Sequence, residues 1–215
     1  RQGGHIDDAP APPRLDDWRY VVLAAAKVGG ILANDTYPVQ FLSENLQIQT
    51  NVMDAALEHD VERLVYLGSS CAYTKDAPQP IKEEYLLTGP LEPTNEAYAI
   101  AKIAGIKQVQ AVRKQYGKPW ISVMPTNLYG PGDNYTEGES HVVAALIRRF
   151  TDAKRENLPS VTNWGTGKPL REFLHVDDLA ANIYELIENY DANIPLNIGS
   201  GDEISIKKLS EMIQK

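Results

Sequence analysis

Residues 64–73 read LVYLGSSCAY, an apolar run followed by a glycine, two serines and the only cysteine of the chain. The run Leu64–Leu67 has the length and the uninterrupted apolar character of a strand that is covered on both faces. Gly68 ends this strand, and the small polar residues follow at once. Because ligands of parallel α/β sheets bind at the carboxyl ends of the strands, this position favours a site after Leu67.

Apolar runs and helical patterns alternate on either side of this stretch. YVVLAAA, residues 20–26, predicts another strand covered on both faces, and residues 38–58 show helical spacing behind Pro38. Residues 96–116 predict a long helix closed by Gly117, and WISVMPTNLYGPG, residues 120–132, predicts a third strand that runs into a Pro/Gly loop. The order strand, helix, strand, helix, strand predicts an α/β fold with a doubly wound parallel sheet of Rossmann-like type. The core-facing positions expected in the first helix are Leu42, Leu46, Met53, Ala56 and Leu57.

Composition excludes several classes of protein. The 215 residues are 43% hydrophobic and 23% charged, which suits one globular domain or two unequal lobes. A net charge of -8 argues against binding of nucleic acid, because such proteins concentrate Lys and Arg on one face. The longest aliphatic run, Val21–Ala26, is far too short to span a bilayer, and nothing directs secretion. We therefore expect a cytoplasmic protein with no membrane partner and no internal disulfide.

Three loops are expected at one edge of the sheet, after Ala26, after Leu67 and after Met124. Residues 68–71 lie in the second of these loops. Read alone, this stretch favours a structural interpretation, in which the glycine forms a turn, the serines satisfy backbone groups and Cys71 is a small buried hydrophobe.

Tyr98 and Lys102 form a Y-x-x-x-K pattern on the long helix. A spacing of four places both side chains on one helix face, although the pattern alone is weak. A nearby ammonium would stabilise the phenolate and lower the tyrosine pKa from about 10. A serine hydroxyl from the strand end would hydrogen-bond the carbonyl oxygen that the phenol protonates. Together these residues predict a site for ketone reduction.

These residues resemble the extended short-chain dehydrogenase/reductases, in which a strand-end serine and Y-x-x-x-K act with a nicotinamide cofactor. Further stretches resemble the GDP-L-fucose synthase family within that superfamily. They are AAAKVGGI, LGSSCAY, LEPTNEAYAIAKIAG, SVMPTNLYGP, WGTGKPLREFLHVDD and the helix with His141 and Arg148-Arg149. The resemblance covers about residues 19–215, and several motifs together are far more specific than one.

The resemblance implies NADPH-dependent 3,5-epimerisation and 4-reduction of GDP-4-keto-6-deoxy-mannose to GDP-L-fucose. Cys71 and His141 match the pair that exchanges protons at the carbons flanking the ketone, and a thiol and an imidazole suit this task near neutral pH. Tyr98 would supply a proton to the ketone oxygen, with Lys102 holding its pKa and the nicotinamide ribose. Ser69 would position the carbonyl. The alternative for His141 is a surface residue near the start of its helix.

The resemblance also implies two sets of binding residues. Those expected at NADP are Leu67, Gly68, Ser69, Ser70, Tyr98, Lys102, Pro125, Thr126, Asn127, Leu128 and His141. Those expected at the GDP-sugar are Asn127, Arg149, Trp164 and Arg171, since guanidinium groups suit phosphate oxygens and an aromatic ring suits a base. Arg148 and His175 are interpreted as structural, Gly29-Gly30 as a turn or a backbone approach to a ligand, and no histidine spacing predicts a metal site.

The sequence departs from the family pattern at both ends. It contains neither G-x-G-x-x-G nor G-x-x-G-x-x-G, the turn that seats a pyrophosphate on a helix N-terminus. We expect residues 1–17 to be a non-matching leader, residues 18–135 and 172–198 an incomplete cofactor domain that lacks its first strands, and residues 136–171 and 199–215 part of a sugar-nucleotide lobe.

Two alternatives to the active enzyme follow from these departures. One is a truncated, non-catalytic remnant that still forms a homodimer through residues 38–58 and 96–116. The other is a related sugar-nucleotide 4-epimerase or 4,6-dehydratase. The dehydratases place an acidic residue after the strand-end Ser/Thr, and Ser70-Cys71 here favours 3,5-epimerase chemistry instead.

Overall fold

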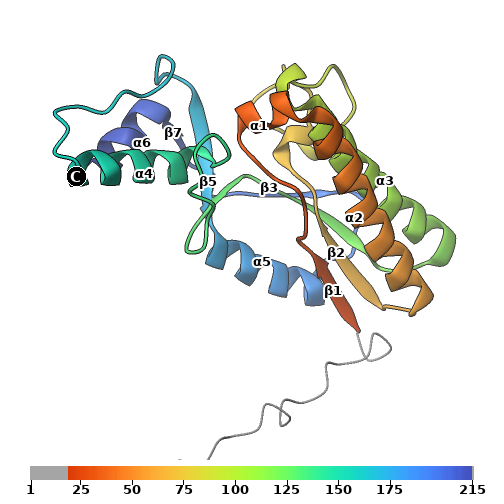
Figure 1. The fold of residues 1–215 in the computed structure, drawn as a ribbon. Coiled ribbons are helices and arrows are strands. Elements are labelled where there is room, and N and C mark those ends of the chain that lie inside the picture. Colours follow the sequence, from red (N-terminus) through yellow and green to blue (C-terminus); the bar gives the residue numbers. More distant parts are fainter. Residues whose placement is uncertain (1–18, 215) are drawn as a thin grey trace, which may run out of the picture.

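A computed structural model describes residues 19–214, so the predicted leader lies outside the described residues. The elements run in chain order as β1 (Tyr20–Leu23), α1 (Ile31–Thr36), α2 (Pro38–Glu58), β2 (Arg63–Leu67), the 3₁₀ helices η3 (Ser70–Ala72), η4 (Glu83–Tyr85) and η5 (Pro93–Asn95), α3 (Glu96–Tyr116), β3 (Ile121–Pro125), β4 (Asn127–Tyr129), α4 (Val142–Arg155), β5 (Leu170–His175), α5 (Val176–Asn189), β6 (Leu196–Ile198), β7 (Glu203–Ser205) and α6 (Ile206–Ile213) (Figure 1).

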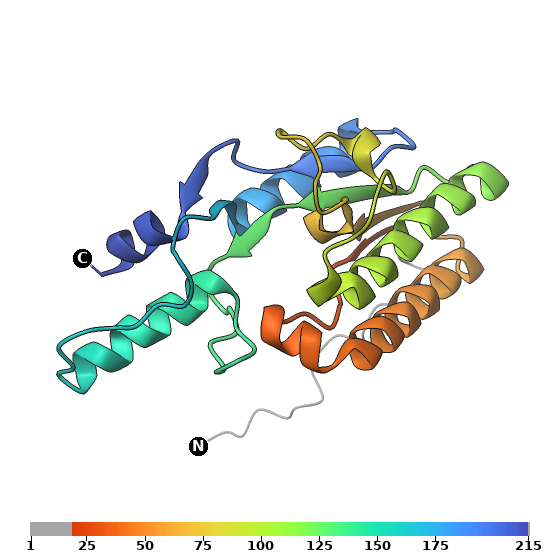
Figure 2. The ribbon, with the colours of Figure 1, turned by 90° about the horizontal axis from the view of Figure 1, so that it is seen from above.

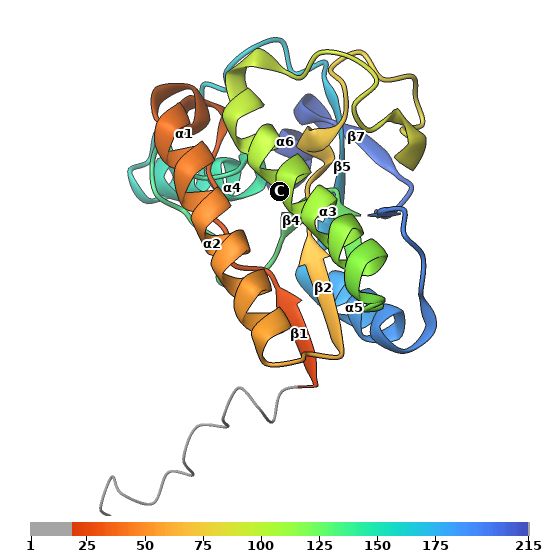
Figure 3. The ribbon, with the colours of Figure 1, turned by 90° about the vertical axis from the view of Figure 1, so that its right-hand side faces the viewer.

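The larger sheet has the strand order β1-β2-β3-β6, and all of its neighbouring strands pair in parallel. Helices α2 and α3 lie side by side on one face of this sheet, and α5 covers the other face (Figures 1 and 3). Parallel strands with helices on both faces confirm the predicted doubly wound α/β fold.

Each face of the larger sheet has its own core. Leu64 and Tyr66 of β2 face the helices α2 and α3, where they pack among Met53, Ile106 and other apolar side chains. Val65, which lies between Leu64 and Tyr66 in the strand, faces α5 on the opposite side. The central strand β2 is therefore buried on both faces, as its continuous apolar run predicted.

The first strand differs from its prediction in length and in burial. β1 ends at Leu23, so the three alanines that follow belong to a loop. Tyr20 is 39% exposed and Val22 42% exposed, although Leu23 is buried. In the described part of the chain, β1 is an edge strand that pairs only with β2, and the core on the α5 side begins at β2. The prediction that this run is covered on both faces is therefore wrong.

The third predicted strand is two strands that belong to different sheets. β3 ends at Pro125, which has no N–H to donate to a ladder, and β4 begins at Asn127 beside β5. Strands β4, β5 and β7 form the smaller sheet, in which β4 and β5 are parallel and β5 and β7 are antiparallel. The chain thus crosses from one sheet to the other at Thr126, whose N–H donates to the Ile198 carbonyl oxygen at 3.0 Å.

Helix α2 has the predicted bounds but a different buried face. Its buried residues are Phe41, Asn45, Gln49, Met53 and Ala56, while Leu42, Leu46 and Leu57 are only half-buried. The two polar residues can lie inside because both are hydrogen-bonded. Asn45 Oδ1 accepts from the Lys27 N–H at 2.8 Å, and Gln49 Nε2 donates to the Ala101 carbonyl oxygen at 2.8 Å.

The smaller sheet, α4 and α6 form the second part of the structure, where α4 and α6 contact each other (Figure 2). Helix α4 begins directly after His141, and α5 begins directly after His175. Within residues 19–214, no helix combines the length and the apolar character needed to cross a bilayer.

Candidate functional site

The turn after β2 is packed closely against β3. The Gly68 N–H donates to the Val123 carbonyl oxygen at 2.8 Å. A side chain at Gly68 would place its Cβ 2.5 Å from Met124 Sδ and 3.1 Å from the Val123 oxygen, so only glycine fits without displacement. This contact holds the residues that follow at the carboxyl edge of the larger sheet.

Ser69 and Cys71 occupy a short 3₁₀ turn at this edge. Ser69 caps the turn, and its Oγ accepts a hydrogen bond from the Cys71 N–H at 3.3 Å. Cys71 is only half-buried, whereas the neighbouring Ala72 is fully buried and belongs to the core. The interpretation of Cys71 as a buried hydrophobe therefore does not hold. Its Sγ accepts a hydrogen bond from Asn95 Nδ2 at 3.2 Å.

Lys102 extends from α3 to the same edge and is almost completely buried. Lys102 is 4% exposed, and its Nζ donates to the Leu67 carbonyl oxygen at 2.7 Å. Nζ lies 5.7 Å from the ring centroid of Tyr98 and 5.2 Å from that of Tyr66. Burial disfavours the charged ammonium and lowers the pKa of Lys102 to about 8.

Tyr98 lies one turn before Lys102, and its phenol is near Ser69 and Cys71. Burial raises the pKa of the Tyr98 phenol, and the charge of Cys71 raises it further, while the hydrogen bond with the Ser69 side chain lowers it. The prediction that the tyrosine pKa lies below 10 is therefore not met in the protein alone, because burial outweighs the stabilising contacts. Ser69, Tyr98 and Lys102 nevertheless lie at the same edge of the sheet.

His141 lies at the N-cap of α4 and is exposed, and its side chain makes no capping hydrogen bond. The turn before it contacts the loop after β1, because the Gly30 N–H donates to the Glu139 carbonyl oxygen at 2.9 Å. Gly30 is the N-cap of α1, and α1 packs against the turn η5 that carries Asn95. A chain of contacts thus connects the turn before His141 to the turn of Asn95, which binds Cys71. Figure 2 shows α1 between the loop before α4 and the start of α3.

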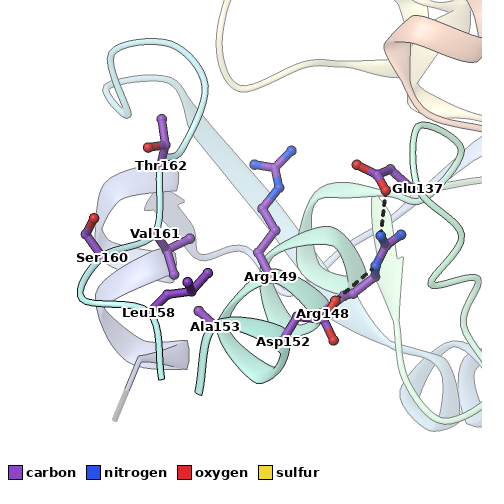
Figure 4. A pocket seen from close by; sticks show the side chains of 9 residues that line it. All are labelled: Glu137, Arg148, Arg149, Asp152, Ala153, Leu158, Ser160, Val161 and Thr162. Atoms are coloured by element: carbon purple, nitrogen blue, oxygen red, sulfur yellow. Dashed lines mark hydrogen bonds and ion pairs between the residues drawn. The ribbon is translucent and has the colours of Figure 1, made fainter. Parts of the chain in front are cut away.

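A second site lies on α4 and the loop that follows it. A cavity of about 270 Å³ is lined there by Glu137, Arg148, Arg149, Asp152, Ala153, Leu158, Ser160, Val161 and Thr162 (Figure 4). Arg148 Nη2 pairs with Glu137 at 2.8 Å and its Nε with Asp152 at 3.4 Å. Arg149 has no ion pair with a described residue, and its guanidinium carbon lies 4.7 Å from the centroid of a Trp164 ring.

Other predicted residues have structural contacts. Asn127 Nδ2 and Thr126 Oγ1 both donate to the Glu172 carbonyl oxygen, at 2.9 and 3.1 Å, and so join β4 to β5. Arg171 is exposed and its Nη1 donates to the Leu170 carbonyl oxygen at 2.7 Å. Pro125 is buried at the end of β3, and Leu128 packs against the core on the α5 side. Ser70 is half-buried in η3.

His175 has the structural role that its position predicted. It caps α5, and its Nδ1 accepts a hydrogen bond from the Asp177 N–H at 3.2 Å. Asp177 and Asp178 lie in the first turn, where the helix dipole favours negative charge. In the described part of the chain, no three His, Cys, Asp or Glu side chains gather as metal ligands would.

Sequence reasoning missed Asn95, which binds the sulfur of Cys71. Asn95 stands three residues before Tyr98 in the helix start, where an asparagine is common for reasons of capping alone. No local signal separates that role from a contact with a residue 24 positions away. The described groups at the sheet edge are thus a thiol, a phenol, a hydroxyl, an amide and a buried ammonium, which together can transfer protons and donate hydrogen bonds to a carbonyl oxygen.

The family model described as "NAD dependent epimerase/dehydratase family" matches residues 14–199 of the chain. The chain is 61% identical over 198 residues to "Probable GDP-L-fucose synthase 1" of Oryza sativa subsp. japonica and 60% identical over 196 residues to "GDP-L-fucose synthase 1" of Arabidopsis thaliana. These matches cover 92% and 91% of this chain, which spans only 60% and 61% of the two relatives. "GDP-L-fucose synthase" of Escherichia coli (strain K12) is 50% identical over 219 residues, with 98% and 67% coverage.

Solved structures are similar over the same part of the chain. "MlghC, GDP-mannoheptose C4 reductase from Campylobacter jejuni with NADP bound" is 35% identical with a TM-score of 0.81, covering 91% of this chain and 68% of that one. "Crystal structure of a gdp-l-fucose synthetase from Naegleria fowleri bound to NADP" is 30% identical with a TM-score of 0.81, covering 91% and 60%.

Proposed function

Because the chain belongs to the NAD dependent epimerase/dehydratase family, we propose that its residues serve the NADPH-dependent 3,5-epimerisation and 4-reduction of GDP-4-keto-6-deoxy-mannose to GDP-L-fucose. The names of several relatives, GDP-L-fucose synthase, support this choice within the family. The observation that carries the proposal is the meeting of Ser69, Cys71, Tyr98 and Lys102 at one sheet edge.

The epimerisation uses groups that take up and release protons near neutral pH. A ketone at carbon 4 of the sugar acidifies the protons on carbons 3 and 5. One group removes such a proton and leaves an enolate, and a second group returns a proton to the opposite face of the same carbon, which inverts it. Cys71 and His141 are our candidates for these two groups. The contacts that run from Gly30 through α1 to Asn95 connect the turns that precede His141 and contact Cys71.

The reduction uses the buried side of the same edge. Tyr98 donates its phenolic proton to the ketone oxygen as carbon 4 becomes an alcohol, and the phenolate regains a proton from solvent. Ser69 lies near the phenol, and its hydroxyl would hydrogen-bond the same ketone oxygen. Lys102 places an ammonium near the ring and stabilises the phenolate. NADPH, when bound, supplies the hydride.

The described residues fit the reactive end of NADPH. The buried Lys102 ammonium lies at the carboxyl end of β2, where dinucleotides bind in parallel sheets, and it offers donors for ribose hydroxyls. The residues expected beside it are Leu67, Gly68, Ser69 and Ser70 after β2, and Pro125, Thr126, Asn127 and Leu128 after β3. The solved structures named above as NADP complexes support NADP as the cofactor. The sequence has no glycine-rich turn for the pyrophosphate, so the fit covers only this end.

The second site suits the GDP part of the substrate. Arg149 carries a charge that no described carboxylate neutralises, and its guanidinium fork fits diphosphate oxygens. Trp164 is 71% exposed and offers a ring face on which a base can stack. We assign Arg171 and Asn127 to the same substrate by resemblance. Arg148 is already paired with Glu137 and Asp152 and is excluded from this role.

We also infer a homodimer that forms through α2 and α3. The two helices lie side by side on the outer face of the larger sheet (Figure 3). Analytical ultracentrifugation should give twice the mass of the chain, and a monomer at all concentrations would contradict the inference. A cytoplasmic location stays a prediction, which imaging of a tagged chain would test.

The proposed activity can be divided into its two halves in one assay. The protein is incubated with GDP-4-keto-6-deoxy-mannose in deuterium oxide, with and without NADPH, while sugar deuteration and cofactor oxidation are followed. We expect deuteration at carbons 3 and 5 in both cases. Deuteration without oxidation would show that the described residues epimerise but do not bind NADPH productively. The absence of both signals would favour the non-catalytic remnant.

A further inference from the structure

Asn95 stands at the start of α3 but does not cap it. An asparagine at this position ordinarily accepts a hydrogen bond from an N–H of the first helical turn. Here the Asn95 side chain makes no such bond. Its Nδ2 instead donates to the sulfur of Cys71 at 3.2 Å, and its Oδ1 is buried with no hydrogen-bond partner among the described residues.

This arrangement costs stability twice. The helix loses a capping bond, and a buried amide oxygen is left without a donor. Positions that break a local rule in this way are most often functional sites, because a residue chosen for stability alone would cap the helix. The hydrogen bond that the Asn95 side chain makes with Cys71 is therefore the feature to be explained.

The turn around Asn95 holds its amide in place. The Asn95 N–H donates to the Glu92 carbonyl oxygen at 3.2 Å, and the Glu92 side chain pairs with Lys75 at 3.0 Å. Helix α1 packs against the turn from another side. Cys71 is held in the same way, since its own N–H donates to Ser69 Oγ. Both partners of the bond thus sit on short, braced turns.

An amide is a suitable partner for a thiol that must gain and lose a proton. An N–H donor binds a thiolate more strongly than a thiol, because hydrogen bonds to charged acceptors are the stronger ones. An amide cannot itself take the proton, unlike an imidazole or an amine. It therefore stabilises the anion without competing for the proton that Cys71 transfers.

We propose that Asn95 is a positioning residue for Cys71, whose amide fixes the sulfur at the sheet edge and stabilises its anionic form during proton exchange with the sugar. The inference rests on the proposed function of Cys71. During the exchange the sulfur takes one proton from a carbon of the substrate or gives one proton to it. The amide N–H stays on Asn95 throughout.

The test uses Cys71 as its own reporter, since it is the only cysteine in the chain. The rate of alkylation by iodoacetamide is measured near pH 7 and again about two pH units above the ordinary thiol pKa of about 8.5. The ratio of the two rates reports the stabilisation of the thiolate, because a change in access to the sulfur affects both rates equally.

We expect Asn95→Ala to lower this ratio about tenfold, the size expected for the loss of a hydrogen bond to a charged group. Asn95→Asp, which is close in shape but only accepts hydrogen bonds when ionised, should lower it at least as much. Thr94→Ala, in the same turn, is the matched control and should leave the ratio unchanged. Circular dichroism of each variant checks folding. If Asn95→Ala does not fold, the ratio measured for Asn95→Asp tests the proposal.

A ratio that is unchanged in both Asn95 variants would overturn the role of Asn95, whatever the activity. Deuterium uptake by the sugar is measured in parallel and should fall about tenfold in Asn95→Ala. If the unmodified chain shows no deuterium uptake, the proposed function fails, and the alkylation ratio still judges the bond between Asn95 and Cys71. The two failures are therefore distinguishable.

Discussion

The edge of the larger sheet and the pocket on α4 use cationic residues in opposite surroundings. At the sheet edge, Lys102 is 4% exposed and its ionisation is weakened by burial. At the pocket, Arg149 is only half-buried, lies beside Trp164, which is 71% exposed, and has no ion pair with a described residue. A buried cation can adjust the proton affinity of its neighbours, whereas an exposed one can attract a charged ligand. Under the proposed function, burial thus separates the residues that take part in proton transfer from those that bind the substrate.

The largest expected effect separates two groups within the sheet edge. Tyr98→Phe removes the phenolic proton, so NADPH oxidation should fall about 10²- to 10⁴-fold, the usual contribution of a general acid. Deuterium uptake at carbons 3 and 5 should change little. Cys71→Ser should instead slow deuterium uptake strongly, because a hydroxyl is a poor base at neutral pH. Mass spectrometry of the sugar and absorbance of NADPH measure the two rates. Equal slowing of deuterium uptake in both variants would contradict this division.

The next effect concerns the pH dependence of stability. The Lys102 pKa is about 8 in the folded chain and 10.5 ordinarily, so between these values the unfolded state binds more protons. The free energy of unfolding should therefore rise with pH from about 8 upward, by roughly 3 kcal/mol at most over the full interval. Burial raises the pKa of Tyr66 and Tyr98, which reduces stability at still higher pH, so urea titrations should stop near pH 10.

Lys102→Met removes this titration and should abolish the rise. Lys107→Met, on the same helix but exposed, is the matched control and should retain it. If Lys102→Met keeps the slope of the unmodified chain, the ammonium is better solvated than its 4% exposure indicates, and the contrast with the pocket weakens.

A smaller effect compares two adjacent arginines in the pocket. Arg149→Ala should weaken the binding of GDP about tenfold, as expected for a lost charge-assisted hydrogen bond. Arg148→Ala should leave GDP affinity within about threefold, because its guanidinium is already held by Glu137 and Asp152. Isothermal titration with GDP measures both. A greater loss in Arg148→Ala would exchange the roles of the two residues.

The smallest expected effect tests the contact between Gly30 and the turn that leads to His141 and α4. An alanine at Gly30 would place its Cβ 2.9 Å from the Ser140 carbonyl oxygen and push away the turn that leads to His141. A displacement of a few tenths of an ångström should lower deuterium uptake about threefold, since proton transfer depends on close alignment. GDP affinity should not change. Uptake equal to that of the unmodified chain would show that the position of His141 does not depend on this contact.

Local patterns account for the elements that the sequence predicted well. Helix α2 begins at Pro38, whose fixed φ suits a first helical residue, and α3 ends at Gly117, which takes a left-handed φ of 68° that other residues adopt at a cost. The apolar run of β2 predicted correctly that this strand is buried on both faces. These features depend on neighbours in the chain, so they can be read from the sequence.

Distant partners account for the features that the sequence did not predict. Asn45 and Gln49 are buried in α2 because the Lys27 backbone and Ala101 satisfy them, and nothing in the helix itself indicates those partners. Burial of Tyr98 reverses the predicted direction of its pKa, because desolvation depends on packing from several elements.

The sequence by itself determined the α/β fold, the parallel order of the central strands and the residue types of the candidate site, because periodicity, turn residues and motif spacing are local properties of the chain. Only the tertiary structure decided that β1 is an edge strand of the described sheet, that Asn95 binds Cys71 and that Glu137 and Asp152 are the partners of Arg148. Each of these depends on which distant segments exclude water from a side chain or satisfy its hydrogen bonds, and a linear pattern does not encode that.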